Sequence, residues 1–495
     1  MGGVRTALYN YLFARNKGGT FILRIEDTDQ KRFVPGAEEY VKESLKWCGM
    51  ELDEGPDQGG GVGPYRQSER RGTYRQHADT LIAADHAYYA FDTSEELDEM
   101  RDKAKQAGLP NWQYNNITRV NMRNSLTMPI EEVEERIANN EPYVIRVKMP
   151  RNEEVKFNDR IRGWVSVNTD NLDDKVLFKS DGIPTYHLAN IADDKAMGIT
   201  HVIRGEEWLP SAPLHVLLYK YLGWEDNMPE FAHLPLILKP NGNGKLSKRD
   251  GDKLGFPVFP LEWKDPESGD VSSGYRENGY FSEGFINMLA FLGWNPGTTQ
   301  EVFTKQELIE QFDLDRVGKA GAKFDPDKTK WFNQQHLRSK SNEDLARLIR
   351  PLIDEKGIEI NTERLEAYCG IMKERASFIP DLMDGSYIFQ APNDFDERTI
   401  KKRWKENTPK ILEGFASRLK DLEPFKANEI EVCMKTYLEE KEIGMGALMA
   451  NFRMVITGQG MGPSMMDISE LLGKEEVLQR IENGIAKISE WVLSK

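Results

Sequence analysis

The sequence predicts a multidomain fold that is α/β in its first two thirds and all-α in its last third. A helical pattern over 1–16 leads through Gly18-Gly19 into an apolar strand pattern over 20–25. Strand and helix patterns alternate again over 201–238, whereas the pattern from about residue 325 onward is helical. The chain has 495 residues, which is enough for about three or four domains.

The middle of the α/β part is interrupted by a region of mixed pattern. A glycine-rich loop precedes a helix expected over 65–84. The stretch from about 88 to 185 then mixes short helices with strand patterns at 143–149 and 164–167, which indicates an inserted α+β unit. After it, we expect a strand at 201–204, a helix at 214–222 and a strand at 234–238, so the parallel sheet resumes.

Helix boundaries can be assigned in the last third. Asn342 is a candidate N-cap for the apolar positions that follow it. Leu471-Leu472-Gly473 ends one helix, and the last helix carries an apolar stripe. The stripe consists of Val477, Ile481, Ile485 and Ile488. Before this region, the stretch 254–279 is rich in Gly, Pro, Ser and Asp and is expected to be a connector or a surface insertion.

The composition argues against several classes of protein. No apolar run approaches the roughly 18 residues of a membrane span, and the first residues lack the apolar core and cleavage site of a signal peptide, so we expect a cytoplasmic protein without a membrane partner. The three cysteines, Cys48, Cys369 and Cys433, are far apart and odd in number, which argues against a disulfide framework and a zinc site. No structural metal and no zinc are expected.

The net charge of −15 argues against nucleic-acid binding as a default, because a phosphate backbone requires a basic surface. Local charge can override this total. Candidate basic stretches are 66–75, 239–253, 319–340 and 401–410, although each could equally be a solvated face.

A loop at 241–249 carries the most distinctive chemistry. Lys245-Leu246-Ser247-Lys248-Arg249 follows Asn241-Gly242-Asn243-Gly244, which places two ammonium groups three residues apart on a glycine hinge. Such a pair suits a polyphosphate, because transfer at phosphorus is catalysed mainly by positioning and electrostatic stabilisation. A Walker A loop is excluded by Lys239 and Leu246, and a dinucleotide fingerprint by Ser247.

Three further segments accompany this loop. They are Thr20-Phe-Ile-Leu-Arg-Ile-Glu-Asp-Thr-Asp29, Ser180-Asp-Gly-Ile-Pro-Thr-Tyr-His-Leu-Ala-Asn190 and Val202-Ile-Arg-Gly-Glu-Glu-Trp208. In this order and spacing, the four segments resemble the bacterial-type glutamyl-tRNA synthetases, a class I aminoacyl-tRNA synthetase family. The resemblance covers essentially the whole chain.

The resemblance implies a domain order. A Rossmann catalytic domain over 1–85 and 188–240 would be split by an acceptor-end-binding insertion at 86–187. A signature loop and stem-contact region would follow at 241–325, and a helical anticodon-binding domain at 326–495.

The resemblance also implies a reaction and its partners. ATP and glutamate, with Mg²⁺ accompanying the ATP, would give glutamyl-adenylate, and the terminal ribose of tRNA(Glu) would then accept the glutamyl group. A monomer is expected. A catalytically impaired tRNA-binding relative, and a non-discriminating enzyme that also charges tRNA(Gln), stay open as alternatives. A glutaminyl-tRNA synthetase is disfavoured, since its anticodon-binding part is β-barrel-like.

By similarity, two lysines are the catalytic candidates. Lys245 and Lys248 would stabilise charge shared between the α-phosphate and pyrophosphate, with Lys248 in direct contact with ATP. The residues expected around ATP are Gly2, Gly3, Glu207, Trp208, Leu236, Lys245, Leu246, Ser247, Lys248 and Arg249. For Trp208 and Leu236, a role in the core is the alternative.

A second group would bind glutamate. Glu26 would pair with the α-ammonium group, since a cation inside a pocket requires a nearby carboxylate. A salt bridge to Arg24 or Arg32 is the alternative for Glu26. Asn190 would line the same amino-acid pocket.

Arg204 and Tyr186 would grip the side-chain carboxylate of glutamate, because a guanidinium fork pairs with a carboxylate but meets the NH₂ of glutamine badly. An ion pair with Glu206 or Glu207 is the alternative for Arg204. In the last third, Arg375 resembles the position that reads the last base of the anticodon.

One family element is not found in this sequence. In the family, a first strand with Pro-Ser-Pro-Thr-Gly runs into a His-(Ile/Val)-Gly element whose histidine and following helix amides bind ATP phosphates. Here Met1-Gly2-Gly3 corresponds to the end of that element, and the first histidine is His77. Two interpretations therefore stay open: the chain is truncated, or the protein has lost adenylation.

Overall fold

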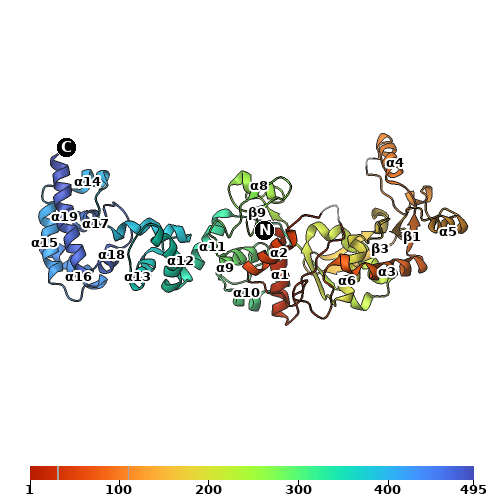
Figure 1. Ribbon diagram of the computed structural model, residues 1–495, viewed down its shortest axis with the longest axis horizontal. Coiled ribbons are helices and arrows are strands. Elements are labelled where there is room, and N and C mark those ends of the chain that lie inside the picture. The colour runs from red at the N-terminus through yellow and green to blue at the C-terminus, as the bar shows by residue number, and fades with distance from the viewer. Residues whose placement is uncertain (30–32, 110, 495) are drawn as a thin grey trace. The chain divides into compact units, whose positions relative to one another are not determined.

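The computed structural model describes residues 1–29, 33–109 and 111–494 and consists of two compact units (Figure 1). Unit 1 comprises Met1–Asn278 and Phe285–Lys328, and unit 2 comprises Gly279–Gly284 and Thr329–Lys495. Within the described helix α8, the side chains of Lys248, Arg249 and Asp252 lie outside the description.

The helices and strands up to residue 278 form an α/β arrangement. The helices are α1 (Gly2–Asn16), α2 (Ala37–Trp47), α3 (Arg71–Ala83), α4 (Ser94–Gln106), α5 (Ile130–Ala138), α6 (Tyr186–Ala196), α7 (Ala212–Tyr221) and α8 (Lys248–Leu254). The strands are β1 (Ala87–Ala90), β2 (Val144–Val147), β3 (Glu154–Asp159), β4 (Gly163–Asn168), β5 (Val176–Phe178), β6 (His201–Gly205), β7 (Glu230–Leu234), β8 (Ile237–Leu238), β9 (Trp263–Lys264) and β10 (Val271–Ser272).

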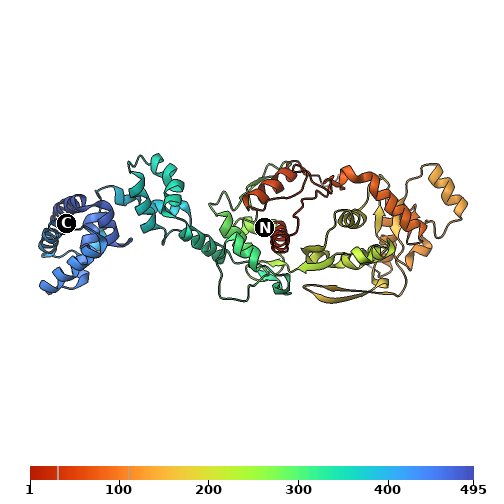
Figure 2. The ribbon, with the colours of Figure 1, turned by 90° about the horizontal axis from the view of Figure 1, so that it is seen from below.

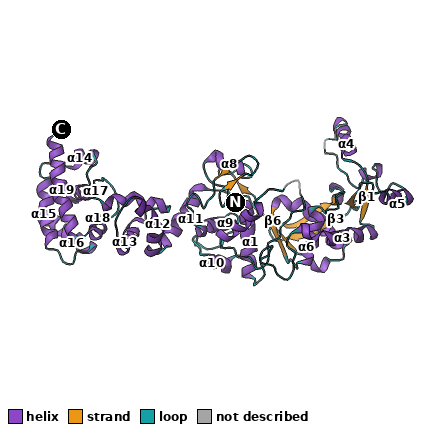
Figure 3. Ribbon diagram, in the orientation of Figure 1, coloured by secondary structure: helices purple, strands orange, loops and turns teal. Residues whose placement is uncertain are grey.

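The remaining elements are mostly helical. They are α9 (Ser282–Ala290), α10 (Lys305–Gln311), β11 (Ala322–Lys323), α11 (Pro326–Ser339), α12 (Asn342–Glu355), α13 (Thr362–Met372), the 3₁₀ segment η8 (Ile379–Phe389), α14 (Glu397–Arg403), α15 (Thr408–Lys420), α16 (Ala427–Glu440), α17 (Met445–Thr457), α18 (Met465–Leu472) and α19 (Lys474–Leu493). Figure 3 shows strands in unit 1, while unit 2, at the blue end of the chain in Figure 2, is built of helices and loops.

The central sheet of unit 1 has the strand order β4-β3-β7-β6. β7 pairs in parallel with both β3 and β6, whereas β4 pairs antiparallel to β3. Alternate residues of β3, namely Val155, Phe157 and Asp159, are buried, as expected for a strand with one face toward the interior. β3 and β4 thus share a sheet with β6 and β7, although their residues lie within the range expected to be an insertion.

Two strand predictions in unit 1 are corrected by the structure. Residues 20–25 do not form a continuous strand but make isolated bridges, Ile22 to Glu54 and Ile25 to Arg66, because their partners belong to two separate segments and no ladder continues. The predicted strand 234–238 is divided at Pro235, which cannot donate to a ladder. Leu234, the first residue of the predicted strand, is the last residue of β7, and β8 pairs with β11 in a separate two-stranded sheet.

Three smaller predictions can also be compared with the structure. The helix expected over 65–84 starts later, with α3 at Arg71. The N-cap of α12 is Ser341, not Asn342, because the Ser341 hydroxyl accepts a hydrogen bond from the Asp344 amide (3.0 Å). All three cysteines are free, with Cys48 and Cys369 buried and Cys433 only partly buried.

α19 packs into the core of unit 2 through the predicted stripe. Val477, Ile481 and Ile488 are buried, and Ile485 is partly buried. Gly484 lies on the same helix against α17, where a Cβ would approach Val455 Cβ to 2.6 Å. The absence of a side chain at Gly484 therefore allows these two helices to pack closely.

Gly484→Ala tests this close approach. Within an exposed helix, alanine is more stable than glycine by about 1 kcal/mol. Here we expect a lower melting temperature instead, because the new methyl group overlaps Val455. Thermal unfolding followed by circular dichroism measures the effect. Gly484→Ala combined with Val455→Ala should recover part of the loss relative to Val455→Ala alone, and a rise in melting temperature for the single variant would contradict the packing argument.

Candidate active site

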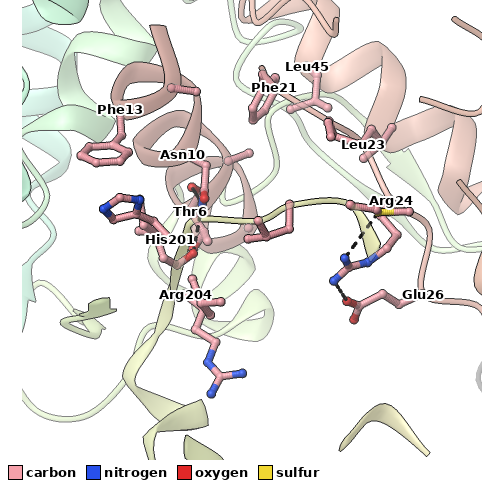
Figure 4. A pocket seen from close by; sticks show the side chains of 18 of the residues that line it. Thr6, Asn10, Phe13, Phe21, Leu23, Arg24, Glu26, Leu45, His201 and Arg204 are labelled. Atoms are coloured by element: carbon pink, nitrogen blue, oxygen red, sulfur yellow. Dashed lines mark hydrogen bonds and ion pairs between the residues drawn. The ribbon is translucent and has the colours of Figure 1, made fainter. Parts of the chain in front are cut away.

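A cavity of about 1040 Å³ lies inside unit 1 (Figure 4). Its walls come mainly from two stretches that are far apart in the sequence, α1 with the segment 19–26 and α6 with β6, and α2 adds to them. Six of the residues singled out from the sequence line it: Gly3, Glu26, Tyr186, Asn190, Arg204 and Trp208. The fold therefore brings residues from distant parts of the chain together around one space.

Arg204, on β6, provides the cationic wall of the cavity. Its Nη1 donates to the hydroxyl of Tyr186 (2.8 Å), its Nη2 to the Trp208 carbonyl (3.4 Å) and its Nε to His233 Nε2 (3.1 Å). The Tyr186 ring lies against the Trp208 ring, with centroids 4.6 Å apart. Burial raises the pKa of Tyr186 to about 12, although the charge of Arg204 opposes this shift, so the phenol stays neutral at physiological pH.

The alternative ion pairs of Arg204 do not form. Glu206 pairs with Arg162 (2.5 Å), and Glu207 pairs with Lys245 (2.8 Å). Both glutamates that neighbour Arg204 in sequence are thus engaged by other cations.

Glu26 provides the acidic wall. Its Oε1 accepts hydrogen bonds from Asn190 Nδ2 (3.0 Å) and from the Arg24 guanidinium (3.3 Å). Arg24 also pairs with the buried Asp194 (2.9 Å). Burial raises the pKa of Asp194, although Arg24 opposes this shift. The sequence-based alternative of a salt bridge between Glu26 and Arg24 therefore exists, while Arg32 lies outside the described residues.

Two polar residues of α1 were not recognised from the sequence. Thr6 and Asn10 are one helical turn apart and both line the cavity, and Asn10 Nδ2 donates to the Ile203 carbonyl on β6 (3.0 Å) (Figure 4). Their spacing of four residues within an otherwise apolar pattern was the available signal. At the start of the same helix, a Cβ added to Gly2 or Gly3 would meet nothing within 4 Å.

The lysine loop lies next to β8. The Leu246 amide donates to the Ile237 carbonyl (2.8 Å), and the side chain of Ser247 donates to Asp250 (2.6 Å) at the start of α8. The Leu236 amide donates to Glu206 Oε1 (2.9 Å). Lys245 and Glu207 each keep about half of their side chain exposed (55% and 45%), so their ion pair can exchange for another partner.

The remaining predicted residues are placed as follows. Trp208 is 42% exposed, which argues against the alternative core role, and Leu236 is partly buried. The side chains of Lys248 and Arg249 lie outside the description. Arg375 belongs to unit 2, where it follows α13, and its Nη2 donates to the Gly462 carbonyl (2.9 Å).

Two negative observations concern the described residues. No group of three or more His, Cys, Asp or Glu side chains in this part of the chain is arranged to hold a metal ion. None of the described helices is long and apolar enough to cross a membrane.

An α/β unit with a cavity of this kind, followed by a helical unit, is the arrangement that the resemblance to class I aminoacyl-tRNA synthetases predicts. Residues 1–331 match the family "tRNA synthetases class I (E and Q), catalytic domain", and residues 344–485 match "Anticodon binding domain". The chain therefore belongs to the class I tRNA synthetases of the glutamate and glutamine type.

Curated relatives and a solved structure agree with this assignment. The chain is 56% identical to a glutamate--tRNA ligase of Phocaeicola vulgatus, covering 98% of this chain and 95% of the relative. It is 52% identical to that of Cytophaga hutchinsonii, covering 100% and 96%. A crystal structure of a glutamate tRNA ligase from Elizabethkingia meningosepticum in complex with its amino acid superposes with a TM-score of 0.90 at 51% identity, covering 98% of this chain and 96% of that chain.

Proposed function

We propose that this chain is a glutamate–tRNA ligase. An oxygen of the α-carboxylate of glutamate attacks the α-phosphorus of ATP, and the bond to pyrophosphate breaks. The terminal ribose oxygen of tRNA(Glu) then attacks the carbonyl carbon of the adenylate, and AMP leaves. The observation that carries this proposal is a cavity with a guanidinium wall, Arg204, and a carboxylate wall, Glu26, which together match the two charged ends of glutamate.

The roles of the cavity residues follow from their chemistry. Arg204 and the neutral Tyr186 bind the side-chain carboxylate, and Glu26, held by Asn190, binds the α-ammonium group. The ion pair of Glu26 with Arg24 does not prevent this, because one carboxylate can accept hydrogen bonds from two cations. Trp208 lines the same cavity, and its sequence neighbour Glu207 pairs with Lys245 of the lysine loop.

ATP is assigned to the lysine loop and to the first turn of α1. Free amides at the start of a helix favour phosphate, and the open space at Gly2 and Gly3 lets phosphates approach the backbone. Lys245 and Lys248 stabilise the charge of the transition state, so Lys245 has to leave Glu207 when the nucleotide binds. Mg²⁺ enters with the ATP phosphates, to which it is mainly bound.

The wider assignment follows the family. Residues 86–187 are proposed to bind the acceptor end of the tRNA and residues 326–495 its anticodon, in a monomeric cytoplasmic enzyme.

Charging of tRNA(Glu) by the purified chain tests the function. Binding of tRNA without charging would instead support the impaired relative, and equal charging of tRNA(Gln) would support a non-discriminating enzyme.

Lys248→Ala tests the lysine loop. We expect glutamate activation to fall by about 10²- to 10³-fold, the usual effect of removing one transition-state stabiliser. Pyrophosphate exchange in the presence of tRNA measures it. Lys220→Ala, which changes an exposed lysine of α7, is the control and should match the parent. Exchange by Lys248→Ala at nearly the parent rate would remove this residue from the mechanism.

Arg204→Ala tests the recognition of the substrate carboxylate. Without the guanidinium, a buried carboxylate is left unpaired, which costs about 2 to 5 kcal/mol of transition-state binding. The kcat/KM for glutamate should therefore fall steeply, while Lys220→Ala, at an exposed lysine outside the cavity, serves as the control. A value for Arg204→Ala within a few-fold of the parent would leave Arg204 with a structural role only.

Arg375→Gln tests the proposed contact with the last anticodon base. Arginine can bind a base edge through two hydrogen bonds, so we expect the preference between glutamate and glutamine tRNAs to change. Charging of both tRNAs is compared with that by Arg347→Gln, an exposed arginine of the same unit. An unchanged preference would exclude Arg375 from the anticodon site.

A further inference from the structure

A buried histidine lies directly behind Arg204. β6 and β7 pair in parallel with Arg204 opposite His233, so the two side chains are neighbours across the ladder. Arg204 Nε donates to His233 Nε2 (3.1 Å). His233 is fully buried and does not line the cavity. It therefore contacts the guanidinium from the side away from the substrate space.

His233 is in turn held by a buried carboxylate. Its Nδ1 lies 2.6 Å from Asp159 Oδ2, and Asp159 Oδ1 accepts hydrogen bonds from the amides of Ile161 (3.0 Å), Arg162 (2.8 Å) and His233 itself (3.3 Å). Burial alone would raise the pKa of Asp159, but these hydrogen bonds outweigh burial and lower it. Asp159 is thus an ionised carboxylate that can only accept hydrogen bonds.

These partners determine which ring nitrogen carries the proton. Burial lowers the pKa of His233, so the ring is neutral at physiological pH, although Asp159 opposes this shift. A neutral imidazole has one N–H group, and the carboxylate of Asp159 requires it on Nδ1. Nε2 then carries a lone pair, which is what the Nε–H group of Arg204 needs.

Arg204 has N–H groups left over that can bind a substrate. Of its five N–H groups, one is taken by His233, one by Tyr186 and one by Trp208. One N–H on each terminal nitrogen has no partner among the described residues. A guanidinium can rotate about its long side chain, so the hydrogen bond that holds its Nε edge adds to those from Tyr186 and Trp208 in directing its fork.

We propose that Asp159 and His233 are positioning residues that direct the terminal N–H groups of Arg204 toward the side-chain carboxylate of the amino-acid substrate. The inference rests on the proposed function, since it concerns the binding of glutamate. It extends the site to two residues that do not touch the substrate, one of them on β3.

Asp159→Asn tests the proton arrangement without changing the shape of the side chain. The carbonyl oxygen of the new amide has to face the three backbone amides, so its NH₂ group faces His233 Nδ1. The histidine must then move its proton to Nε2, and two N–H groups oppose each other at Arg204. We expect glutamate binding to weaken by about 10- to 100-fold, as for a lost hydrogen bond to a charged group.

Two substitutions at His233 form a matched pair. His233→Asn keeps a donor for Asp159 but has no atom that reaches Arg204, so it should weaken glutamate binding by about 10-fold or more. His233→Gln places an amide oxygen near the former Nε2 and should stay within about threefold of the parent. If His233→Asn fails to fold, Asp159→Asn still supplies the test, because it conserves shape and the backbone contacts.

The dissociation constants for glutamate and for ATP are measured by isothermal titration calorimetry on the purified full chain and each variant. A positioning role predicts weaker glutamate binding with ATP binding within about twofold of the parent. In an Arg204→Lys background, which lacks the Nε–H group, Asp159→Asn should add less than about a twofold change, because the path through Arg204 is already interrupted.

Several outcomes would overturn the inference. The first is glutamate binding by Asp159→Asn and His233→Asn within about threefold of the parent. The second is a loss of ATP binding that accompanies the loss of glutamate binding. The third is an undiminished effect of Asp159→Asn in the Arg204→Lys background. A parent chain that binds no glutamate would instead defeat the proposed function, and this inference with it. The two failures are therefore distinguishable.

Discussion

A buried guanidinium needs an acceptor for every N–H group that solvent no longer reaches, and this requirement organises the site. Arg204 is 8% exposed, and the parallel pairing of β6 with β7 places an imidazole acceptor beside it. Asp159, at the end of β3, accepts a hydrogen bond from the other ring nitrogen of this imidazole and so completes the chain of hydrogen bonds. Leaving any of these groups unpaired would be costly in a dry interior. The geometry of the cationic wall thus depends on three strands of one sheet.

The need to pair buried charged groups also determines the acidic wall of the cavity, and here the partners come from α6. Tyr186, Asn190 and Asp194 recur every four residues, so they share the face of α6 that lines the cavity. Asp194 holds Arg24, which in turn contacts Glu26. On another face of the helix, Asp193 accepts hydrogen bonds from Gln67, Arg70 and Tyr74. One helix therefore ties the segments 20–26 and 65–74 to the site through buried carboxylates.

Parts of the structure that depend on residues close together in the sequence were predicted more easily than parts that depend on distant residues. α1, α7, β6, α12 and α19 were predicted from local periodicity, as was the helical character of the last third, and the fold class is confirmed. The segment 20–25 was predicted as a strand because its side chains are apolar, yet it finds only isolated bridges. The cap of α12 was misplaced by one residue because serine and asparagine are both good caps, and only the hydrogen bond to Asp344 distinguishes them.

By itself, the sequence determined the class of protein, the order of its motifs and the main charged residues that line the cavity. These rest on residue types and spacings that are visible along the chain. Only the tertiary structure decided that Glu206 and Glu207 turn to Arg162 and Lys245, which leaves Arg204 for the cavity. It alone also placed Asp159 behind His233, although the two are 74 residues apart. Strand pairing sets such contacts, and pairing between distant strands leaves no periodic signal in the sequence.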